Sequence, residues 1–222
     1  MTDSRAALVI FDLDGTLADT LGDIAWAMDT VLASRGLPPH RLEEYRAFIG
    51  DGVEELVSRS LPAAQLALTP LVIAEFRRLY LAHMFDRTAP YPGVPELLDE
   101  VTARGIPMAV LSNKLEAATQ AIVAHLFGRW RFAAAVGERP DVPRKPDPTA
   151  ALAIAGGIGA APARTLLCGD SGNDMETAVR AGMFPVGVLW GFRDRDDLLA
   201  RGARAVISRP WELVSLFDPV PG

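Results

Sequence analysis

Short apolar runs of strand length alternate with helical patterns along most of this chain, and this alternation limits its fold more than any other feature. The apolar runs lie at residues 6–11, 107–111, 132–136, 165–168 and 184–189, with a shorter one at 203–207. Helical patterns lie between and after them, at residues 94–104, 115–126, 148–155, 173–181 and 194–200. Continuous apolar runs are typical of strands buried on both faces, and strands that alternate with helices form parallel sheets. We therefore predict an α/β fold with a doubly wound parallel sheet.

One long segment, residues 19–85, breaks the alternation. It contains amphipathic helical stretches at residues 19–34, 52–60 and 66–85 but no convincing buried strand. Gly15, Thr16 and Asp19 mark one boundary of the segment, and the turn-rich residues 89–93 mark the other. We predict an α/β core domain made of residues 1–18 and 86–222, with an inserted helical domain at residues 19–85.

Composition and charge exclude several classes of function. The formal net charge is −6, and no basic block could neutralise a polyanion, so we expect no nucleic-acid partner and no membrane partner. The first apolar run is too short for a signal peptide, no run reaches transmembrane length, and the single cysteine, Cys168, cannot form an internal disulfide. We expect a cytoplasmic protein, either a monomer or a homodimer. Among the 22 basic residues only Lys114 and Lys145 are lysines, which makes each of them a candidate for a specific role.

Acidic residues follow two of the predicted strands. The motif Asp12-Leu13-Asp14-Gly15-Thr16 follows the first apolar run, and Gly169-Asp170-Ser171-Gly172-Asn173-Asp174 follows the run at residues 165–168. Because the carboxyl ends of parallel strands lie at one edge of the sheet, we expect the two motifs to meet there. Carboxylate oxygens without histidine or cysteine ligands suit a hard cation such as Mg²⁺. The alternatives are turn-forming aspartates in the first motif and a helix N-cap in the second.

Two further polar segments are candidates for binding an anion. Lys145 lies in a loop stiffened by prolines, and it is either a solvated surface charge or a compact cation within a site. Ser112 and Asn113 follow the run at residues 107–111 and precede a predicted helix. Ser112 is therefore either a simple N-cap or, together with backbone N–H groups at the helix N-terminus, part of a phosphate site.

Taken in order, four motifs resemble those of the haloacid dehalogenase superfamily. They are Asp12-x-Asp14-Gly15-Thr16, Ser112-Asn113, Lys145-Pro146 and Gly169-Asp170-Ser171-x-x-Asp174. Each motif alone is weak to moderate, whereas the four in sequence are specific. The resemblance covers about residues 6–190. It implies a Rossmann-like core, a helical cap between the first two motifs, and an enzyme that hydrolyses small-molecule phosphate esters.

The resemblance also implies a chemical role for the acidic residues and for Lys145. Asp12 is implied to be the nucleophile that forms an aspartyl-phosphate, and Asp14 to protonate the leaving alkoxide and later activate water. Lys145 is implied to supply positive charge. Mg²⁺ is implied to be held by Asp12, by the main-chain carbonyl group of Asp14 and by Asp170.

The remaining matched residues are implied to bind or orient. Ser112 and the N–H group of Asn113 would bind phosphate oxygens, and Thr16 would steer Asp14. Asp174 would orient Lys145 or a metal-bound water.

A narrower resemblance concerns the substrate. Residues 12–20, 48–52, 91–94 and 112–114 are similar to the phosphoglycolate phosphatase branch of the superfamily, which implies hydrolysis of 2-phosphoglycolate to glycolate and phosphate. Recognition of the glycolate carboxylate needs a cation or a helix N-terminus. We expect the amide groups after Gly50 to bind it, with Arg59 as a helper. The alternative is that Arg59 is a solvated helix residue.

Other functions stay open at this point. A hydrolytic dehalogenase of the superfamily needs neither Asp14 nor the acidic cluster at Asp170, so both oppose that function. A phosphomutase shares all four motifs. A phosphatase of another small phosphate, such as a sugar phosphate, a nucleotide or pyrophosphate, is a further alternative. A non-catalytic binding protein would be expected to lack at least one of the residues above.

Overall fold

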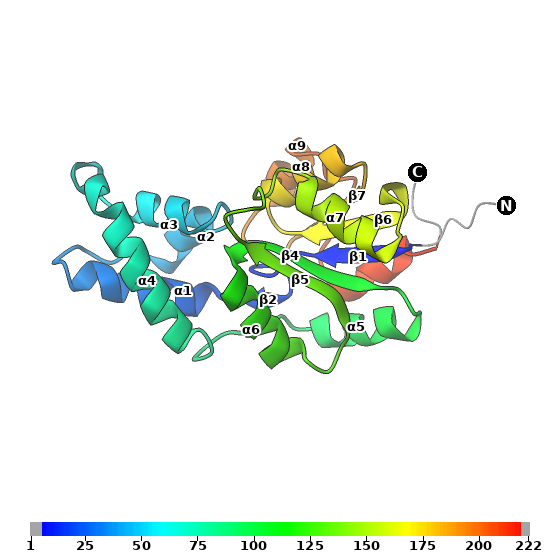
Figure 1. The fold of residues 1–222 in the computed structure, drawn as a ribbon, viewed down its shortest axis with the longest axis horizontal. Coiled ribbons are helices and arrows are strands. Elements are labelled where there is room, and N and C mark those ends of the chain that lie inside the picture. Colours follow the sequence, from blue (N-terminus) through cyan, green and yellow to red (C-terminus); the bar gives the residue numbers. More distant parts are fainter. Residues whose placement is uncertain (1–5, 219–222) are drawn as a thin grey trace.

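Six parallel strands form the central sheet, in the order β5-β4-β1-β6-β7-β8 (Figure 1). The computed structural model of the chain describes residues 6–218. The strands are β1 (Leu8–Phe11), β4 (Met108–Leu115), β5 (Phe132–Glu138), β6 (Thr165–Gly169), β7 (Phe184–Val188) and β8 (Ala205–Ile207). Each strand falls on a predicted apolar run, and the predicted doubly wound parallel sheet is confirmed. Residues 1–5 and 219–222, which the predicted core includes, lie outside the described residues.

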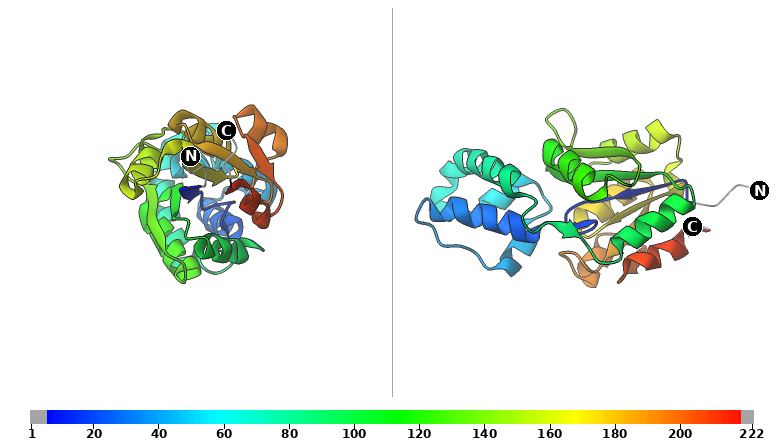
Figure 2. Two further views of the ribbon diagram at one scale, coloured as in Figure 1. Left: turned by 90° about the vertical axis from the view of Figure 1, so that its right-hand side faces the viewer. Right: turned by 90° about the horizontal axis from the view of Figure 1, so that it is seen from below.

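Helices cover both faces of this sheet (Figures 1 and 2). They are α5 (Val94–Ala103), α6 (Glu116–Phe127), α7 (Thr149–Ile158), η2 (Pro162–Arg164), α8 (Gly172–Ala181), α9 (Arg195–Ala200) and η3 (Pro210–Leu216). Val9 and Phe11 of β1 belong to the same buried cluster as residues of α5, α6 and η3. Leu8 and Ile10 belong to a second cluster with residues of α7 and α8. Successive residues of a strand point to opposite faces, so a run that is apolar throughout is buried on both sides.

Residues 21–83 form a separate helical unit at the carboxyl ends of the strands (Figures 1 and 2). It contains α1 (Leu21–Ala33), α2 (Leu42–Phe48), α3 (Val53–Ser60), η1 (Ala63–Leu68) and α4 (Thr69–His83). Buried apolar residues recur every three or four positions in α1 and every four in α4, and the two helices pack against each other. Among the described helices, none combines the length and the apolar character needed to span a membrane.

Two features of this region were not predicted. The first is α2, whose 7 residues are too few for a clear helical period. The second is an antiparallel pair of two-residue strands, β2 (Ala18–Asp19) and β3 (Ala89–Pro90), where the chain enters and leaves the helical unit. Strands of two residues are too short to leave a periodic pattern. The pair lies near the predicted boundaries of the inserted domain.

Candidate functional site

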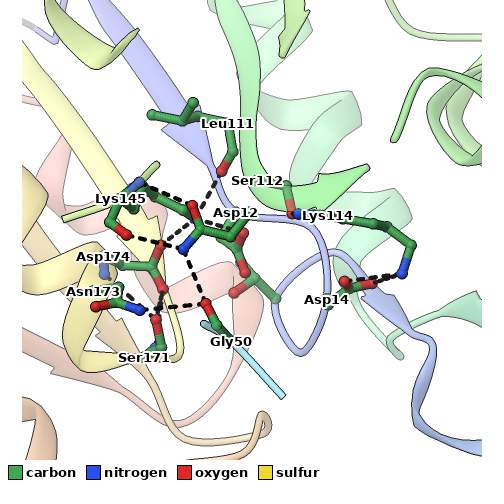
Figure 3. A network of polar contacts seen from close by, with 12 residues as sticks. Asp12, Asp14, Gly50, Leu111, Ser112, Lys114, Lys145, Ser171, Asn173 and Asp174 are labelled. Carbon is green, nitrogen blue, oxygen red and sulfur yellow. Dashed lines mark hydrogen bonds and ion pairs between the residues drawn. The ribbon is translucent and has the colours of Figure 1, made fainter. Parts of the chain in front are cut away.

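Polar side chains from four separate segments meet at the carboxyl edge of the sheet, next to the helical unit (Figure 3). Asp12 directly follows β1, Asp170 directly follows β6, and Ser112 lies within β4. Lys145 comes from the loop between β5 and α7. All four residues are buried. The parallel sheet thus brings the two acidic motifs together, as expected for residues at the ends of neighbouring strands.

Gly15 allows the first acidic motif to approach the second closely. Its φ of 83° lies in the left-handed region, which glycine adopts without strain. A Cβ atom at this position would stand 2.2 Å from Oδ2 of Asp170. Asp170 is held there by the N–H group of Phe192, which donates to Oδ2 at 2.7 Å, and by the Thr16 hydroxyl, 3.5 Å from Oδ1. Even an alanine at position 15 would therefore displace Asp170.

Lys145 holds two of the three buried aspartates of the site (Figure 3). Its ammonium group donates to Oδ1 of Asp12 at 2.7 Å and to Oδ1 of Asp174 at 2.6 Å. It also donates to the carbonyl oxygen of Leu111 at 2.8 Å. The side chain of Lys145 is 3% exposed, so the alternative that it is a solvated surface charge is wrong. An ammonium group has three donors on one atom and suits three convergent acceptors. A planar guanidinium group does not fit this arrangement.

The three aspartates form a cluster that could hold a metal ion. One oxygen atom from each of Asp12, Asp170 and Asp174 lies within 4.8 Å of the other two. Burial raises the pKa of Asp12 to about 7, against the opposing effect of Lys145. Burial also raises the pKa of Asp170 well above its ordinary value, and the neighbouring carboxylates add to this. Three carboxylates and one ammonium sum to a net charge of −2 when all are ionised, so a divalent cation would balance the cluster.

Asp174 also helps to cap the N-terminus of helix α8. Its Oδ2 atom accepts hydrogen bonds from the N–H group of Ser171 at 3.0 Å and from the Ser171 hydroxyl at 2.6 Å. The Ser171 hydroxyl in turn accepts from the N–H group of Asp174, which completes a capping box. The N-cap is therefore Ser171, and the helix begins at Gly172, one residue before the predicted stretch. Capping and contact with Lys145 occur together, because Asp174 uses a different oxygen for each.

The expectation that Ser112 opens a helix is wrong. Parallel pairing with β5 keeps β4 extended as far as Leu115, and α6 begins only at Glu116. The Ser112 hydroxyl instead accepts a hydrogen bond from the N–H group of Lys114 at 3.3 Å. Both Ser112 and Asn113 line the cleft beside the aspartates. The site therefore has a hydroxyl group at this position but no helix N-terminus.

Asn113 connects the loop that carries Lys145 with the helical unit. Its Oδ1 atom accepts from the N–H group of Lys145 at 2.9 Å, and its Nδ2 atom donates to the Lys145 carbonyl oxygen at 3.0 Å. The same Nδ2 atom donates to the carbonyl oxygen of Gly50 at 3.0 Å. The side chain of Asn113 is thus fully used in positioning, which leaves only its backbone for a ligand.

Asp14 points towards a second lysine rather than towards Asp12 (Figure 3). The ammonium group of Lys114 donates to both carboxylate oxygens of Asp14, at 2.9 and 3.0 Å. The hydroxyl group of Thr20 donates to Oδ1 of Asp14 at 2.7 Å. Thr20 therefore takes the steering role that was expected of Thr16. The hydroxyl group of Thr16 faces Asp170 instead.

Lys114 is buried between the two halves of the molecule. Its side chain is 7% exposed, and its ammonium lies 4.5 Å from the ring centroid of Tyr80 on α4, within range of a cation–π contact. Burial would lower the pKa of Lys114, but Asp14 and Tyr80 outweigh that effect and raise it above its ordinary value. Both lysines of the chain therefore lie in this site, and each pairs with one aspartate of the first motif.

A cleft of about 810 Å³, including the solvent at its mouth, separates the sheet edge from the helical unit. Its floor is polar and comes from the sheet edge, with Asp12, Asp14, Ser112, Lys114, Lys145 and Asp170. Its roof is mostly apolar and comes from the helical unit, with Ile24, Ile49, Val53, Leu56, Phe76, Tyr80 and Leu81. The charged floor therefore faces a mostly apolar roof.

The loop at residues 49–52 docks the helical unit onto the sheet. The carbonyl oxygen of Gly50 accepts from Asn113 and also from Nδ2 of Asn173, at 3.3 Å. Asn173 donates to Oδ1 of Asp51 at 2.6 Å, and Arg144 donates to Oε2 of Glu54 at 2.7 Å. Gly50 has a φ of 119°, a conformation open to glycine alone. Gly50 is also one of the residues that line the cleft. Its contact with a substrate stays a prediction.

Arg59 takes a different position from the one expected. Its guanidinium pairs with Asp51 at 2.5 Å and donates to the carbonyl oxygens of Ala47 and Phe48, at 3.3 and 3.2 Å. It is not among the residues that line the cleft. Arg59 therefore braces the chain just before Gly50.

Lys114 and Tyr80 were not predicted as site residues. A signal for Lys114 existed, since it is one of only two lysines and adjoins the Ser112-Asn113 motif. Tyr80 carried no such signal. It occupies the buried stripe of α4 with Val72 and Phe76, at a spacing of four, and has the pattern of an ordinary core aromatic residue.

Known proteins resemble this chain over most of its length. Residues 9–188 match the family of haloacid dehalogenase-like hydrolases. A phosphoglycolate phosphatase of Caulobacter vibrioides is 33% identical over 209 residues, which cover 92% of this chain and 88% of the relative. One of Aquifex aeolicus is 33% identical over 211 residues, which cover 95% of this chain and 96% of the relative. The crystal structure of a predicted phosphoglycolate phosphatase from Haemophilus somnus matches with a TM-score of 0.86 at 25% identity, covering 95% of this chain and 97% of that one.

Proposed function

The chain belongs to the haloacid dehalogenase-like hydrolases and is a phosphatase, and we propose that it hydrolyses 2-phosphoglycolate to glycolate and phosphate with the help of Mg²⁺. The observation that carries the proposal is the buried cluster of Asp12, Lys145, Asp170 and Asp174 at one sheet edge. In this proposal residues 19–85 act as a cap over the cleft. The core consists of residues 1–18 and 86–222.

Asp12 is the proposed nucleophile. Lys145 binds its Oδ1 atom, so Oδ2 is the oxygen to attack phosphorus. The new bond joins Oδ2 to phosphorus as the ester P–O bond breaks, and the electron pair leaves with the ester oxygen. A carboxylate about 3 Å from a phosphate oxygen is repelled by about 5 kcal/mol per unit charge at an effective dielectric constant near 20. The buried charge of Lys145 offsets part of that repulsion.

The donor set fits Mg²⁺. Carboxylate oxygens dominate, and none of the described residues in the cluster is a histidine or a cysteine. We propose that Asp12, Asp170 and the main-chain carbonyl group of Asp14 hold the ion. Both oxygens of Asp174 are used by Lys145 and Ser171, which favours a supporting role for Asp174. When bound, Mg²⁺ would neutralise negative charge on the nucleophile and the phosphate.

Asp14 is the proposed general acid and base. It gives a proton to the departing alkoxide, and in the second step it takes a proton from the water that attacks phosphorus. The P–O bond to Asp12 then breaks, and its electron pair returns to the carboxylate. The Ser112 hydroxyl and the N–H group of Asn113 would bind phosphate oxygens throughout. For the first step Asp14 has to leave its contact with Lys114.

A panel of phosphate esters tests this function. We expect kcat/KM for 2-phosphoglycolate to exceed the values for glycerol phosphate, sugar phosphates, nucleotides and pyrophosphate at the same Mg²⁺ concentration, and EDTA to abolish turnover. The release of free phosphate, rather than an isomeric ester, separates a phosphatase from a phosphomutase. If any other ester exceeds 2-phosphoglycolate by about tenfold, the proposed substrate is wrong.

A further inference from the structure

Recognition of a carboxylate next to the reacting phosphate needs a cation, and few of the described residues that line the cleft can supply one. Lys145 already donates to three oxygen atoms. Arg193 donates to the carbonyl oxygens of Arg46 and Ala47 in α2 and to that of Ile49, the last at 3.1 Å. Arg77 pairs with Glu54 at 3.8 Å, and its side chain is 37% exposed, although its Nε atom is buried and has no hydrogen-bond partner among the described residues. Lys114 is the buried cation whose present partner, Asp14, has to leave it in the proposed mechanism.

Lys114 stands where the leaving group of a small ester would lie. The proposed function places Asp14 at the ester oxygen, and the Lys114 ammonium contacts both oxygens of Asp14. In 2-phosphoglycolate one methylene group separates the ester oxygen from the carboxyl carbon, so the carboxylate oxygens lie about 3 Å from the ester oxygen. A cation in contact with Asp14 is therefore within reach of that carboxylate.

Tyr80, which contacts Lys114 from the helical unit, provides an independent observation. Tyr80 is 4% exposed. Among the described residues its hydroxyl group has no hydrogen-bond partner of normal geometry, although Lys114 lies close by. Burying a hydroxyl group without a partner is unfavourable, so a ligand that accepts its hydrogen bond would be stabilised. Tyr80 comes from the helical unit and Lys114 from the sheet edge. A ligand that contacts both side chains would therefore touch both halves.

We propose that Lys114 and Tyr80 form the binding site for the carboxylate of the leaving group. The inference rests on the proposed function for the position of the reacting phosphate. Without substrate, the carboxylate of Asp14 pairs with the ammonium group of Lys114. The substrate carboxylate replaces it, and Asp14, which takes up a proton from solvent once it has left the cation, turns towards the ester oxygen while Thr20 remains its neighbour. The same event would select the substrate and release the general acid.

The apolar surroundings of Lys114 and Tyr80 would strengthen their contacts with a carboxylate. Leu56, Phe76 and Leu81 line the roof beside Tyr80. In an apolar environment a single ion pair or charged hydrogen bond is stronger than in water. An ester with a neutral leaving group would leave Lys114 paired with Asp14, so it would be selected against.

The test compares 2-phosphoglycolate with its carboxamide analogue, which has the same shape but no charge. Lys114→Met keeps an unbranched side chain and removes the cation. We expect it to lower the ratio of kcat/KM for the two substrates by about 100-fold, as loss of a buried charged partner does. Tyr80→Phe should lower the ratio by about fivefold. Arg77→Gln, a matched control at another cationic position of the cleft, should change it by less than about twofold.

Each outcome decides a separate point. If the wild type does not prefer 2-phosphoglycolate to the carboxamide, the proposed substrate fails together with the carboxylate site. If the wild type prefers it and Lys114→Met keeps that preference, only the carboxylate site is overturned. An equal loss for both substrates also overturns it, because Lys114 then acts only through Asp14.

Inhibition by inorganic phosphate reports whether the variant retains a folded site. If Lys114→Met does not fold, inhibition by glycolate and by glycolamide decides the point. Glycolate should inhibit the wild type more strongly than glycolamide, and Tyr80→Phe should reduce that difference. Equal inhibition of the wild type by the two compounds would overturn the carboxylate site.

Discussion

The two halves of the cleft differ in what they present to a substrate. The sheet edge presents buried charges, Asp12, Lys145 and Asp170, which hydrogen bonds hold in place before any ligand arrives. The helical unit presents mostly apolar side chains, together with the Tyr80 hydroxyl group, which has no hydrogen-bond partner of normal geometry among the described residues. Fixed charges can stabilise the transition state of any phosphate ester, whereas an apolar surface discriminates only by the leaving group. Chemistry and selection therefore belong to different parts of the chain, and changes in each half should affect different kinetic quantities.

The largest effect is expected for Asp12→Asn. The substitution removes the nucleophile with almost no change in volume, so kcat should fall by at least about 10⁴-fold for every ester. Because burial already disfavours the charge of Asp12, the metal-free variant should melt at the same temperature as the wild type or higher. Asp141→Asn, at an exposed aspartate, is the control and should keep full activity. Comparable loss of activity in the control would point to a general effect of removing charge.

Lys145→Ala should cost on the order of 10²-fold or more in kcat, as the loss of one preorganised transition-state charge does. Lys145→Arg should recover little of it, because a planar guanidinium cannot donate to Asp12, Asp174 and the Leu111 carbonyl from one point. The loss should be similar for all esters, which steady-state kinetics on two substrates would show. Near-complete rescue by arginine would mean that Lys145 supplies only distant charge.

A smaller effect is expected where the two halves meet. Asn173→Ala removes the hydrogen bonds to Asp51 and to the Gly50 carbonyl group, so the docking loop should close less well over the cleft. We expect kcat/KM to fall by about tenfold. Glu176→Gln, on the same helix but paired with Arg180 and Arg201, is the control. Equal effects of the two substitutions would show that helix α8, rather than the docking contact, is responsible.

The smallest expected effect concerns the stability of the metal-free protein. Burial raises the pKa of Asp12 from its ordinary 3.8 to about 7, so between these pH values the folded protein holds a proton that the unfolded chain has released. This contribution to stability is complete below the ordinary pKa and is lost as pH rises through about 7. The melting temperature of the wild type in EDTA should therefore fall by several degrees relative to Asp12→Asn between about pH 5 and pH 8.

Added Mg²⁺ should raise the melting temperature more at the higher pH, where it competes with fewer protons. A difference between wild type and Asp12→Asn that does not change with pH would show that Asp12 is not titrated in this range.

The sequence was most informative about the sheet edge. Apolar runs mark β1, β4, β5, β6 and β7, and the residues directly after a parallel strand lie at one edge, so Asp12 and Asp170 could be placed together. The chain's preference for arginine also marked Lys145 and Lys114 as unusual. These signals are local, because strand and motif adjoin each other.

The remaining features of the site depend on packing between distant segments. The pairing of Lys114 with Asp14 spans 100 residues, and nothing near either residue specifies it. Thr16 and Thr20 are equally plausible neighbours of Asp14 until the backbone turns Thr16 towards Asp170. Arg59 has the pattern of a free cation, yet Asp51 binds it. Long-range contacts of this kind are set by tertiary structure and leave no periodic signal in the sequence.

The stereochemical course at phosphorus tests the proposed passage of the phosphoryl group through Asp12 most directly. The substrate would be a 2-phosphoglycolate whose thiophosphoryl group is made chiral with an oxygen isotope, hydrolysed in water that carries a third oxygen isotope. Two in-line displacements, first by Asp12 and then by water, predict that the inorganic thiophosphate keeps the configuration of the substrate. Inversion of configuration would mean that water attacks the ester directly, and it would contradict a covalent intermediate on Asp12.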